Sequence, residues 1–216
     1  MTAKAKICGL SNLETMNAAI DAGASIIGFV FFPPSPRNVD PVIAGELCNS
    51  AKGKIQTAGV FVNPDDALLG EVLKEADLDY IQLHGTETLE RIQYIKSRFG
   101  KKVIKAISVA SVSDIARARE YENHVDMLLF DAKPPTDMEN ALPGGNGLEF
   151  DWQLIAGKEW KVPWLLSGGL DETNVAQAIK ISGAKMVDVS SGVEETPGTK
   201  NIEKINAFMK AIQEIE

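Results

Sequence analysis

The chain has 216 residues, of which 44% are hydrophobic and 24% charged, which is typical of a folded globular protein and excludes a mainly disordered one. Its formal net charge of −8 argues against nucleic acid or an anionic membrane as a partner, but is compatible with a small anionic ligand. The longest apolar run, residues 26–32, is too short to span a membrane, no signal-peptide stretch follows Met1, and two cysteines make a disulfide framework unexpected, so we expect a cytoplasmic protein.

Short segments rich in β-branched residues alternate along the chain with longer amphipathic segments. Strands are predicted over residues 5–9, 26–31, 57–62, 79–83, 103–107, 126–131, 162–166 and 186–190. Helices are predicted over residues 12–22, 41–52, 64–76, 87–99, 112–122, 151–159, 172–182 and 201–215. Strands separated by helices run parallel. Eight such units in 216 residues predict an α/β fold, a (β/α)8 barrel that forms a single domain over residues 1–216.

Capping residues mark the predicted helix ends. Ser11 or Asn12 can cap the first helix, and Asp40 and Asn63 each precede a proline at a predicted first helical position. Glycines that favour a left-handed conformation follow three helices, at positions 23, 100 and 183. A doubly wound open sheet is the alternative fold, but its first turn usually reads Gly-x-Gly-x-x-Gly. Here the turn reads CGLS at residues 8–11, which favours the barrel.

In such barrels, ligands and catalytic groups lie at the C-terminal ends of the strands. Cys8 ends the first predicted strand, where it is either a buried small hydrophobe or a thiolate nucleophile or base. Gln82 and His84 share the inward face at the end of the fourth strand, which favours contact with a ligand. Asp131 ends an inward apolar row on the sixth strand, where an acid is costly unless it is paired, used for capping, or used in chemistry.

Two kinds of loop at these strand ends suit an anion. A loop stiffened by prolines presents Arg37, whose guanidinium group is suited to bidentate binding of a carboxylate. The alternative is that Arg37 is a solvated charge on the surface. Loops after strands six, seven and eight are rich in glycine and serine, which let backbone N–H groups approach a phosphate; the alternative is simple tight turns. The residues concerned are Gly145, Asn146, Gly147, Ser167, Gly168, Gly169, Ser190, Ser191 and Gly192. The segment 132–149 is longer than a turn requires, which indicates a lid or binding loop.

The sequence predicts neither a metal nor a nucleotide cofactor. The candidate soft ligands Cys8, Cys48, His84 and His124 show no close spacing of the kind that zinc sites use. A dinucleotide-binding fingerprint is missing as well.

A set of motifs runs in order from residue 6 to residue 200. They are KICGL at 6–10, GFVF at 28–31, SPR at 35–37, GVFVN at 59–63, QLHG at 82–85, FD at 130–131, GGNG at 144–147, FDW at 150–152, SGGL at 167–170 and VDVSSGVE at 187–194 with PG at 197–198. This set resembles the phosphoribosylanthranilate isomerase family, a barrel enzyme of tryptophan biosynthesis. The chain departs from the family pattern at Asn146, where threonine is frequent, and at Asn201, where aspartate is common.

The resemblance implies a cofactor-independent Amadori rearrangement of N-(5-phosphoribosyl)anthranilate, an aminoaldose, to the 1-deoxyribulose 5-phosphate ketose. It implies Cys8 as the general base and Asp131 as the general acid. It further implies that Arg37 binds the anthranilate carboxylate, that the glycine-rich segments bind the phosphate, and that His84 and Asp188 line the pocket. The oligomeric state, monomer or homodimer, stays open.

These roles require shifted acidities. Our hypothesis is that helix ends and nearby cations favour the Cys8 thiolate, while the apolar row beneath Asp131 disfavours its charged form.

Three other interpretations of the function remain. The histidine-pathway aminoaldose isomerase usually has two aspartates, and indoleglycerol-phosphate synthase uses a lysine acid and a glutamate base, so the pair Cys8 and Asp131 argues against both. A non-catalytic phosphate-binding barrel would be free to lose either residue.

Overall fold

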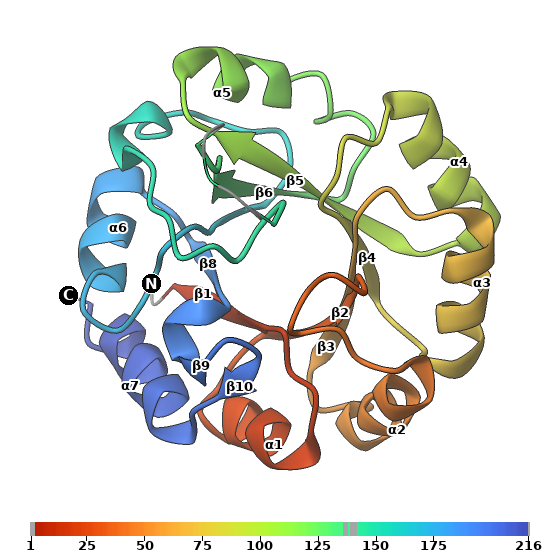
Figure 1. Ribbon diagram of the computed structural model, residues 1–216. Coiled ribbons are helices and arrows are strands. Elements are labelled where there is room, and N and C mark those ends of the chain that lie inside the picture. The colour runs from red at the N-terminus through yellow and green to blue at the C-terminus, as the bar shows by residue number, and fades with distance from the viewer. Residues whose placement is uncertain (1–2, 136–137, 139–141, 216) are drawn as a thin grey trace.

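Eight parallel strands form a closed barrel in chain order, as the sequence predicts (Figure 1). The computed structural model describes residues 3–135, 138 and 142–215, so residues 136–137 and 139–141 of the predicted binding loop lie outside the described residues. The barrel strands are β1 Lys4–Cys8, β2 Ile26–Phe31, β3 Gln56–Phe61, β4 Tyr80–Leu83, β5 Lys102–Val109, β6 Met127–Ala132, β7 Trp164–Leu166 and β8 Met186–Val189.

Helices surround the barrel. They are α1 Leu13–Asp21, α2 Pro41–Ala51, α3 Asp66–Glu75, α4 Leu89–Phe99, α5 Val112–Ala118, α6 Val175–Ser182 and α7 Ile202–Gln213. Asn12 and Asp40 cap α1 and α2 as predicted, and Gly100 and Gly183 end α4 and α6 in the left-handed conformation. None of the described helices is long and apolar enough to cross a membrane.

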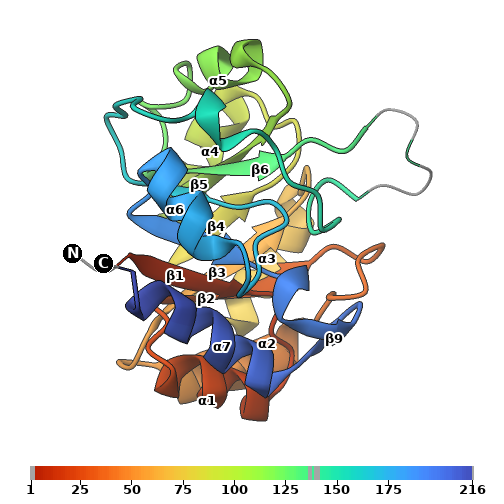
Figure 2. The ribbon, with the colours of Figure 1, turned by 90° about the vertical axis from the view of Figure 1, so that its left-hand side faces the viewer.

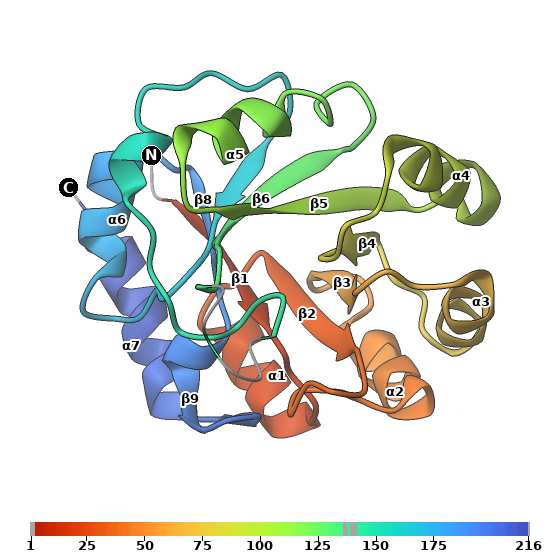
Figure 3. The same ribbon diagram turned by 45° about the horizontal axis from the view of Figure 1, so that its top comes forward.

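The structure differs from the predictions in three places. The segment 151–159 forms a single 3-10 turn, η1 Trp152–Leu154, beside α6 (Figure 3), because Gly157 adopts a left-handed conformation with φ of 66° that interrupts a helix. Asn63 does not cap α3; Asp65 does, through a bond to Leu68 N. Before α7, a second 3-10 turn, η2 Ser191–Val193, leads into an unpredicted hairpin of β9 Glu194–Thr196 and β10 Thr199–Lys200.

Successive side chains of each strand point to opposite faces of the sheet, which produces two apolar layers. Side chains of one face fill the barrel interior; they are Ile26, Ala58, Tyr80, Ile104, Ala106, Met127, Leu129 and Leu165. Side chains of the other face, such as Ile7, Phe29 and Phe130, pack against the helices in a larger cluster. Because all strands run in one direction, their C-terminal ends meet at one end of the barrel, opposite the chain termini (Figure 2).

Shortening a side chain of the inner layer should destabilise the barrel. Leu129 is fully buried, so Leu129→Ala leaves a cavity and should lower the free energy of unfolding by about 2–5 kcal/mol, measured by urea denaturation followed by circular dichroism. The control is Val112→Ala, at a side chain that is 62% exposed, with an expected change of about 0.5 kcal/mol or less. Equal losses in the two variants would show that the inner layer does not carry this stability.

Candidate active site

A pocket of about 780 Å³, including the part open to solvent, lies at the C-terminal end of the barrel. Its lining contains all of the predicted site residues except Gly192. They are Cys8, Arg37, His84, Asp131, Gly145, Asn146, Gly147, Ser167, Gly168, Gly169, Asp188, Ser190 and Ser191. Gly192 instead lies against the backbone of the strand-seven loop, where a Cβ would come 1.9 Å from the carbonyl oxygen of Leu170. The fold therefore gathers the predicted residues from six of the eight units at one place.

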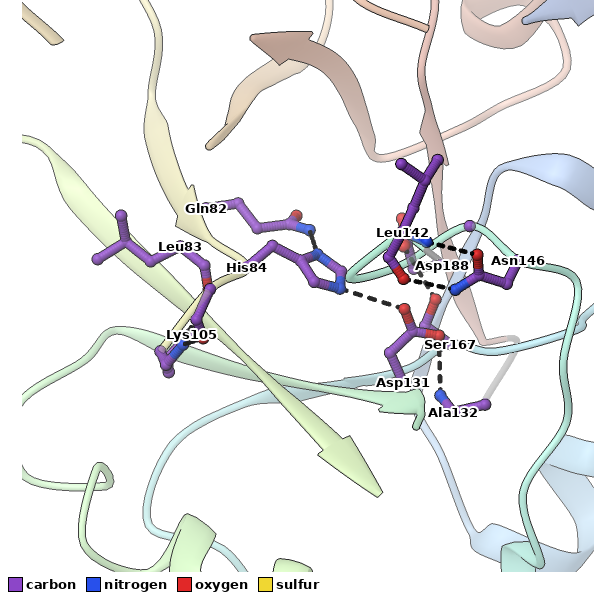
Figure 4. A network of polar contacts seen from close by, with 12 residues as sticks. Gln82, Leu83, His84, Lys105, Asp131, Ala132, Leu142, Asn146, Ser167 and Asp188 are labelled. Carbon is purple, nitrogen blue, oxygen red and sulfur yellow. Dashed lines mark hydrogen bonds and ion pairs between the residues drawn. The ribbon is translucent and has the colours of Figure 1, made fainter. Parts of the chain in front are cut away.

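Gln82, His84 and Asp131 form a chain of contacts across the pocket (Figure 4). Asp131 is near the end of β6, and one of its carboxylate oxygens, Oδ2, lies 3.2 Å from His84 Nε2. The other histidine nitrogen, Nδ1, lies 3.1 Å from Gln82 Nε2. A neutral His84 that accepts from Gln82 carries its proton on Nε2 and donates it to Asp131. Asp131 Oδ1 also accepts from the backbone N–H of Ala132 at 2.9 Å, so both carboxylate oxygens are held in place.

A buried lysine that sequence reasoning missed lies beneath Cys8. Lys6 is fully buried and donates from Nζ to Asp188 Oδ1 at 2.7 Å, while Ser167 Oγ donates to Asp188 Oδ2 at 3.1 Å. A Cβ added to Gly28 would lie 2.9 Å from Cys8 Sγ and 3.2 Å from Lys6 Nζ, so the thiol and the ammonium group both border this glycine. The signal was present in the sequence, because Lys6 and Cys8 are two residues apart and thus share the inward face of β1.

The acidity of Cys8 differs from our hypothesis. Burial raises the pKa of the Cys8 thiol above its ordinary value, although the neighbouring Lys6 charge opposes this shift. Burial alone would lower the pKa of Lys6, but Asp188 and Cys8 outweigh it and the pKa is raised, so Lys6 remains a cation. Lys6 and Lys200 favour the thiolate, as the hypothesis states, but the loss of water around the sulfur outweighs them, so the net shift is upward and not downward.

Arg37 already binds a carboxylate of the chain itself. Its Nε and Nη2 donate to Oε1 and Oε2 of Glu194 at 2.7 and 2.8 Å, and Nη2 also lies 3.3 Å from the carbonyl oxygen of Gly145. Lys200 donates to the same Glu194 Oε1 at 2.7 Å, so one carboxylate is buried between two cations. Burial would raise the pKa of Glu194, but Arg37 and Lys200 hold it below its ordinary value. Of the Arg37 nitrogens, Nη1 alone has no hydrogen-bond partner among the described residues, and bidentate binding of a ligand carboxylate by Nη1 and Nη2 would compete with the Nη2 bond to Gly145 O, not with the bonds to Glu194.

The predicted phosphate loops present mainly backbone donors. Gly168 and Gly169 have φ of 91° and 61°, which favours glycine, and a Cβ at either position would approach the backbone of Ala132 or Leu148 to 3 Å or less. Their N–H groups, and that of Ser191, have no acceptor within the described parts of the chain. The hydroxyls of Ser167 and Ser190 are already engaged, with Asp188 and with the carbonyl oxygen of Cys8. Free N–H groups in such loops are suited to bind an anion.

The side chain of Asn146 binds the backbone of its own loop. The Asn146 side chain accepts from Leu142 N at 3.0 Å and donates to Leu142 O at 2.7 Å, so it closes its own loop at the mouth of the pocket. Within residues 3–135, 138 and 142–215, no three His, Cys, Asp or Glu side chains are placed together as a metal ion would require.

Comparison with known proteins gives concordant matches. The family model for N-(5'phosphoribosyl)anthranilate (PRA) isomerase matches residues 5–211. The N-(5'-phosphoribosyl)anthranilate isomerase of Paramagnetospirillum magneticum is 50% identical over 211 residues, which are 98% of this chain and 97% of that protein. The solved phosphoribosyl anthranilate isomerase of Thermotoga maritima has a TM-score of 0.86 at 35% identity, over 98% of each chain. A phosphoribosyl anthranilate isomerase in complex with reduced 1-(o-carboxyphenylamino)-1-deoxyribulose 5-phosphate has a TM-score of 0.83 at 34% identity, again over 98% of each chain.

The raised pKa of Cys8 predicts how its reactivity depends on pH. In a Cys48→Ala background, alkylation of Cys8 by iodoacetamide should be slow at neutral pH and should accelerate through the alkaline range, because the thiolate is the reactive form. Lys6→Met should move this profile to higher pH by about 1 unit or more, since it removes the neighbouring positive charge. Lys4→Met, at an exposed position of the same strand, is the control and should leave the profile in place. An unchanged profile in Lys6→Met would contradict the assigned contact.

Proposed function

The chain belongs to the N-(5'-phosphoribosyl)anthranilate isomerase family of tryptophan biosynthesis, and we propose that its pocket catalyses the Amadori rearrangement of N-(5-phosphoribosyl)anthranilate to 1-(2-carboxyphenylamino)-1-deoxyribulose 5-phosphate. The observation that carries the proposal is that Cys8 of β1 and Asp131 of β6 line one pocket, together with Arg37 and the glycine-rich loops. We further propose that the barrel over residues 1–216 is one catalytic domain.

The reaction requires a proton to be given at one atom and removed at another. Asp131 protonates the furanose ring oxygen, so that the ring opens to an iminium ion. Cys8, as the thiolate, then removes the proton from C2, which gives an enolamine that tautomerises to the ketone. Proton transfer by positioned side chains of this kind contributes about 10²–10⁴-fold in rate. The bonds to His84 and to Ala132 N fix the Asp131 carboxyl group at the mouth of the pocket.

Lys6 supports the role of Cys8 as a base. When the thiol ionises, negative charge appears on Sγ beside the Lys6 ammonium group, which favours the charged form. Asp188 opposes this effect, but it also holds Lys6 in place through the 2.7 Å bond. We infer that Asp188 is a positioning residue for Lys6 as well as part of the pocket wall.

Binding of the substrate uses its two anionic ends. We propose that Nη1 of Arg37 donates to the anthranilate carboxylate, while the bonds to Glu194 keep the guanidinium plane fixed. The phosphate then binds to the backbone N–H groups of the loops at 144–147, 167–169 and 190–192.

The rearrangement moves hydrogen within one molecule and involves no net oxidation, so we propose that no cofactor takes part. Two free cysteines agree with a reducing, cytoplasmic location.

The isomerase activity can be measured directly. The substrate is generated from anthranilate and phosphoribosyl pyrophosphate by the preceding enzyme, and its fluorescence should fall rapidly when this protein is added. Cys8→Ser and Asp131→Asn should each lower kcat by about 10²–10⁴-fold. Circular dichroism of each variant confirms that it is folded. A folded wild-type protein that does not accelerate the loss of fluorescence would refute the proposal, and a variant of normal rate would exclude the role of that residue.

The assignment of Arg37 predicts a change in KM. Arg37→Lys removes the Nη1 donor and the planar bonds to Glu194, so KM should rise about ten- to hundredfold, as expected for loss of one hydrogen bond between charged groups. The drop in kcat should be smaller. Arg91→Lys, which alters a surface pair with Asp66, is the control and should change neither constant. If KM stays constant in Arg37→Lys, the carboxylate binds elsewhere.

A further inference from the structure

A further buried ion pair lies outside the pocket, in the layer between the barrel and the helices. Lys105 of β5 donates from Nζ to Glu87 Oε2 at 2.7 Å, and their side chains are 2% and 1% exposed. The neighbours of Lys105 in sequence, Ile104 and Ala106, face the barrel interior, so Lys105 faces the helices. Neither member of the pair lines the pocket. Burying two charges is costly, and apolar residues of similar size often stabilise a core equally well. The pair therefore requires an explanation other than stability.

The contacts of this pair converge on the backbone on either side of His84. Lys105 Nζ donates to the carbonyl oxygens of Leu83 and Gly85 at 3.3 and 2.7 Å. The Glu87 carboxylate accepts from Gly85 N at 3.0 and 3.1 Å. Three backbone groups adjacent to His84 are thus held by two side chains. His84 N itself donates to the carbonyl oxygen of Phe61 at 2.8 Å.

The same pair joins the neighbouring loop to this point. Glu87 Oε1 accepts from Asn63 N at 2.9 Å, and Asn63 Oδ1 accepts from Thr86 N at 2.8 Å. Asn63 has a positive φ of 46°, which is uncommon for a residue other than glycine. A Cβ added to Gly85 would lie 2.4 Å from Asn63 Oδ1, so the two loops are in close contact. These contacts leave little freedom for the backbone that carries His84.

We propose that Lys105 and Glu87 are positioning residues that act from outside the barrel to fix the contact between His84 and Asp131. Figure 4 shows the arrangement: Lys105 lies on one side of the end of β4, and the His84 ring reaches from there towards Asp131 on the other. A shift of His84 by an ångström would break the 3.2 Å contact with Asp131 or the 3.1 Å contact with Gln82. The importance of this contact for catalysis rests on the proposed function, in which Asp131 is the acid.

The test uses the two histidines of the chain as reporters. The chain contains only His84 and His124, so the ring nitrogen signals of both can be assigned in one NMR spectrum of the full-length protein. The His124 ring contacts Gln93 and makes no hydrogen bond to Lys105 or Glu87, so it is the internal control. The double variant Lys105→Met/Glu87→Gln removes both buried charges together and avoids leaving one of them unpaired. Lys102→Met, at an exposed position of the same strand, is the matched control.

We expect the double variant to change the ring signals of His84 but not those of His124. We also expect kcat to fall about tenfold or more, with KM changed less than about threefold, because the contact affects the acid rather than the binding of substrate. In a His84→Asn background, the same double substitution should have no further effect on kcat. Glu87→Asp keeps the charge but shortens the reach to Gly85, so it should give a smaller change of the same kind and tests the proposal should the double variant not fold.

Two results would overturn the proposal. One is unchanged His84 signals in a folded double variant or in Glu87→Asp. The other is an equal loss of kcat in the presence and absence of His84, which would indicate a general structural role. If the wild-type protein shows no isomerase activity, the proposed function fails, but the His84 signals still test the positioning.

Discussion

The site depends on one ion pair at the seam where the barrel closes. Lys6 of β1 and Asp188 of β8 are register partners, so the 2.7 Å bond between them joins the first and last barrel strands. Cys8 lies two residues further along β1, and Ser167 donates to the same aspartate from the loop after β7. Correct closure of the barrel and correct assembly of the thiol site are therefore the same event. A register shift of one residue would turn Lys6 and Cys8 towards the helices and remove both from the pocket.

Two other parts of the pocket are also held by buried charges. Glu194 holds Arg37, and the pair of Lys105 and Glu87 holds the backbone around His84. Buried ion pairs contribute little to stability on average, because the loss of hydration offsets the attraction between the charges. Here the ion pairs orient neighbouring groups, since a charged hydrogen bond fixes the plane of a guanidinium group or the position of a loop. The apolar layers stabilise the barrel, and the ion pairs orient the groups at its mouth.

The sequence predicted most of the fold but none of these ion pairs, for a physical reason. The alternation of side-chain direction along a strand is a local property, so it identified the strands and predicted that Gln82, His84 and Asp131 face inward. The partners of the ion pairs are far apart in the chain: 182 residues separate Lys6 from Asp188, and 157 separate Arg37 from Glu194. Their pairing depends on strand register and on a hairpin that has no strong local pattern. The helix predicted over 151–159 was wrong because one left-handed glycine outweighed the amphipathic spacing around it.

The charges along the pocket also bear on the proposal that this acidic protein binds a ligand with two anionic ends. Arg37, Glu194 and Lys200 carry two positive charges and one negative charge, so this cluster favours an anion next to Arg37, while Lys6 and Asp188 balance each other. Among the described residues no lysine lines the pocket, and we propose that the phosphate binds to the backbone N–H groups of the glycine-rich loops. Backbone N–H donors have fixed positions, and they carry no formal charge that could pair with another group of the protein. In this proposal, binding depends on the distance between the phosphate and the carboxylate of the ligand as well as on their charge.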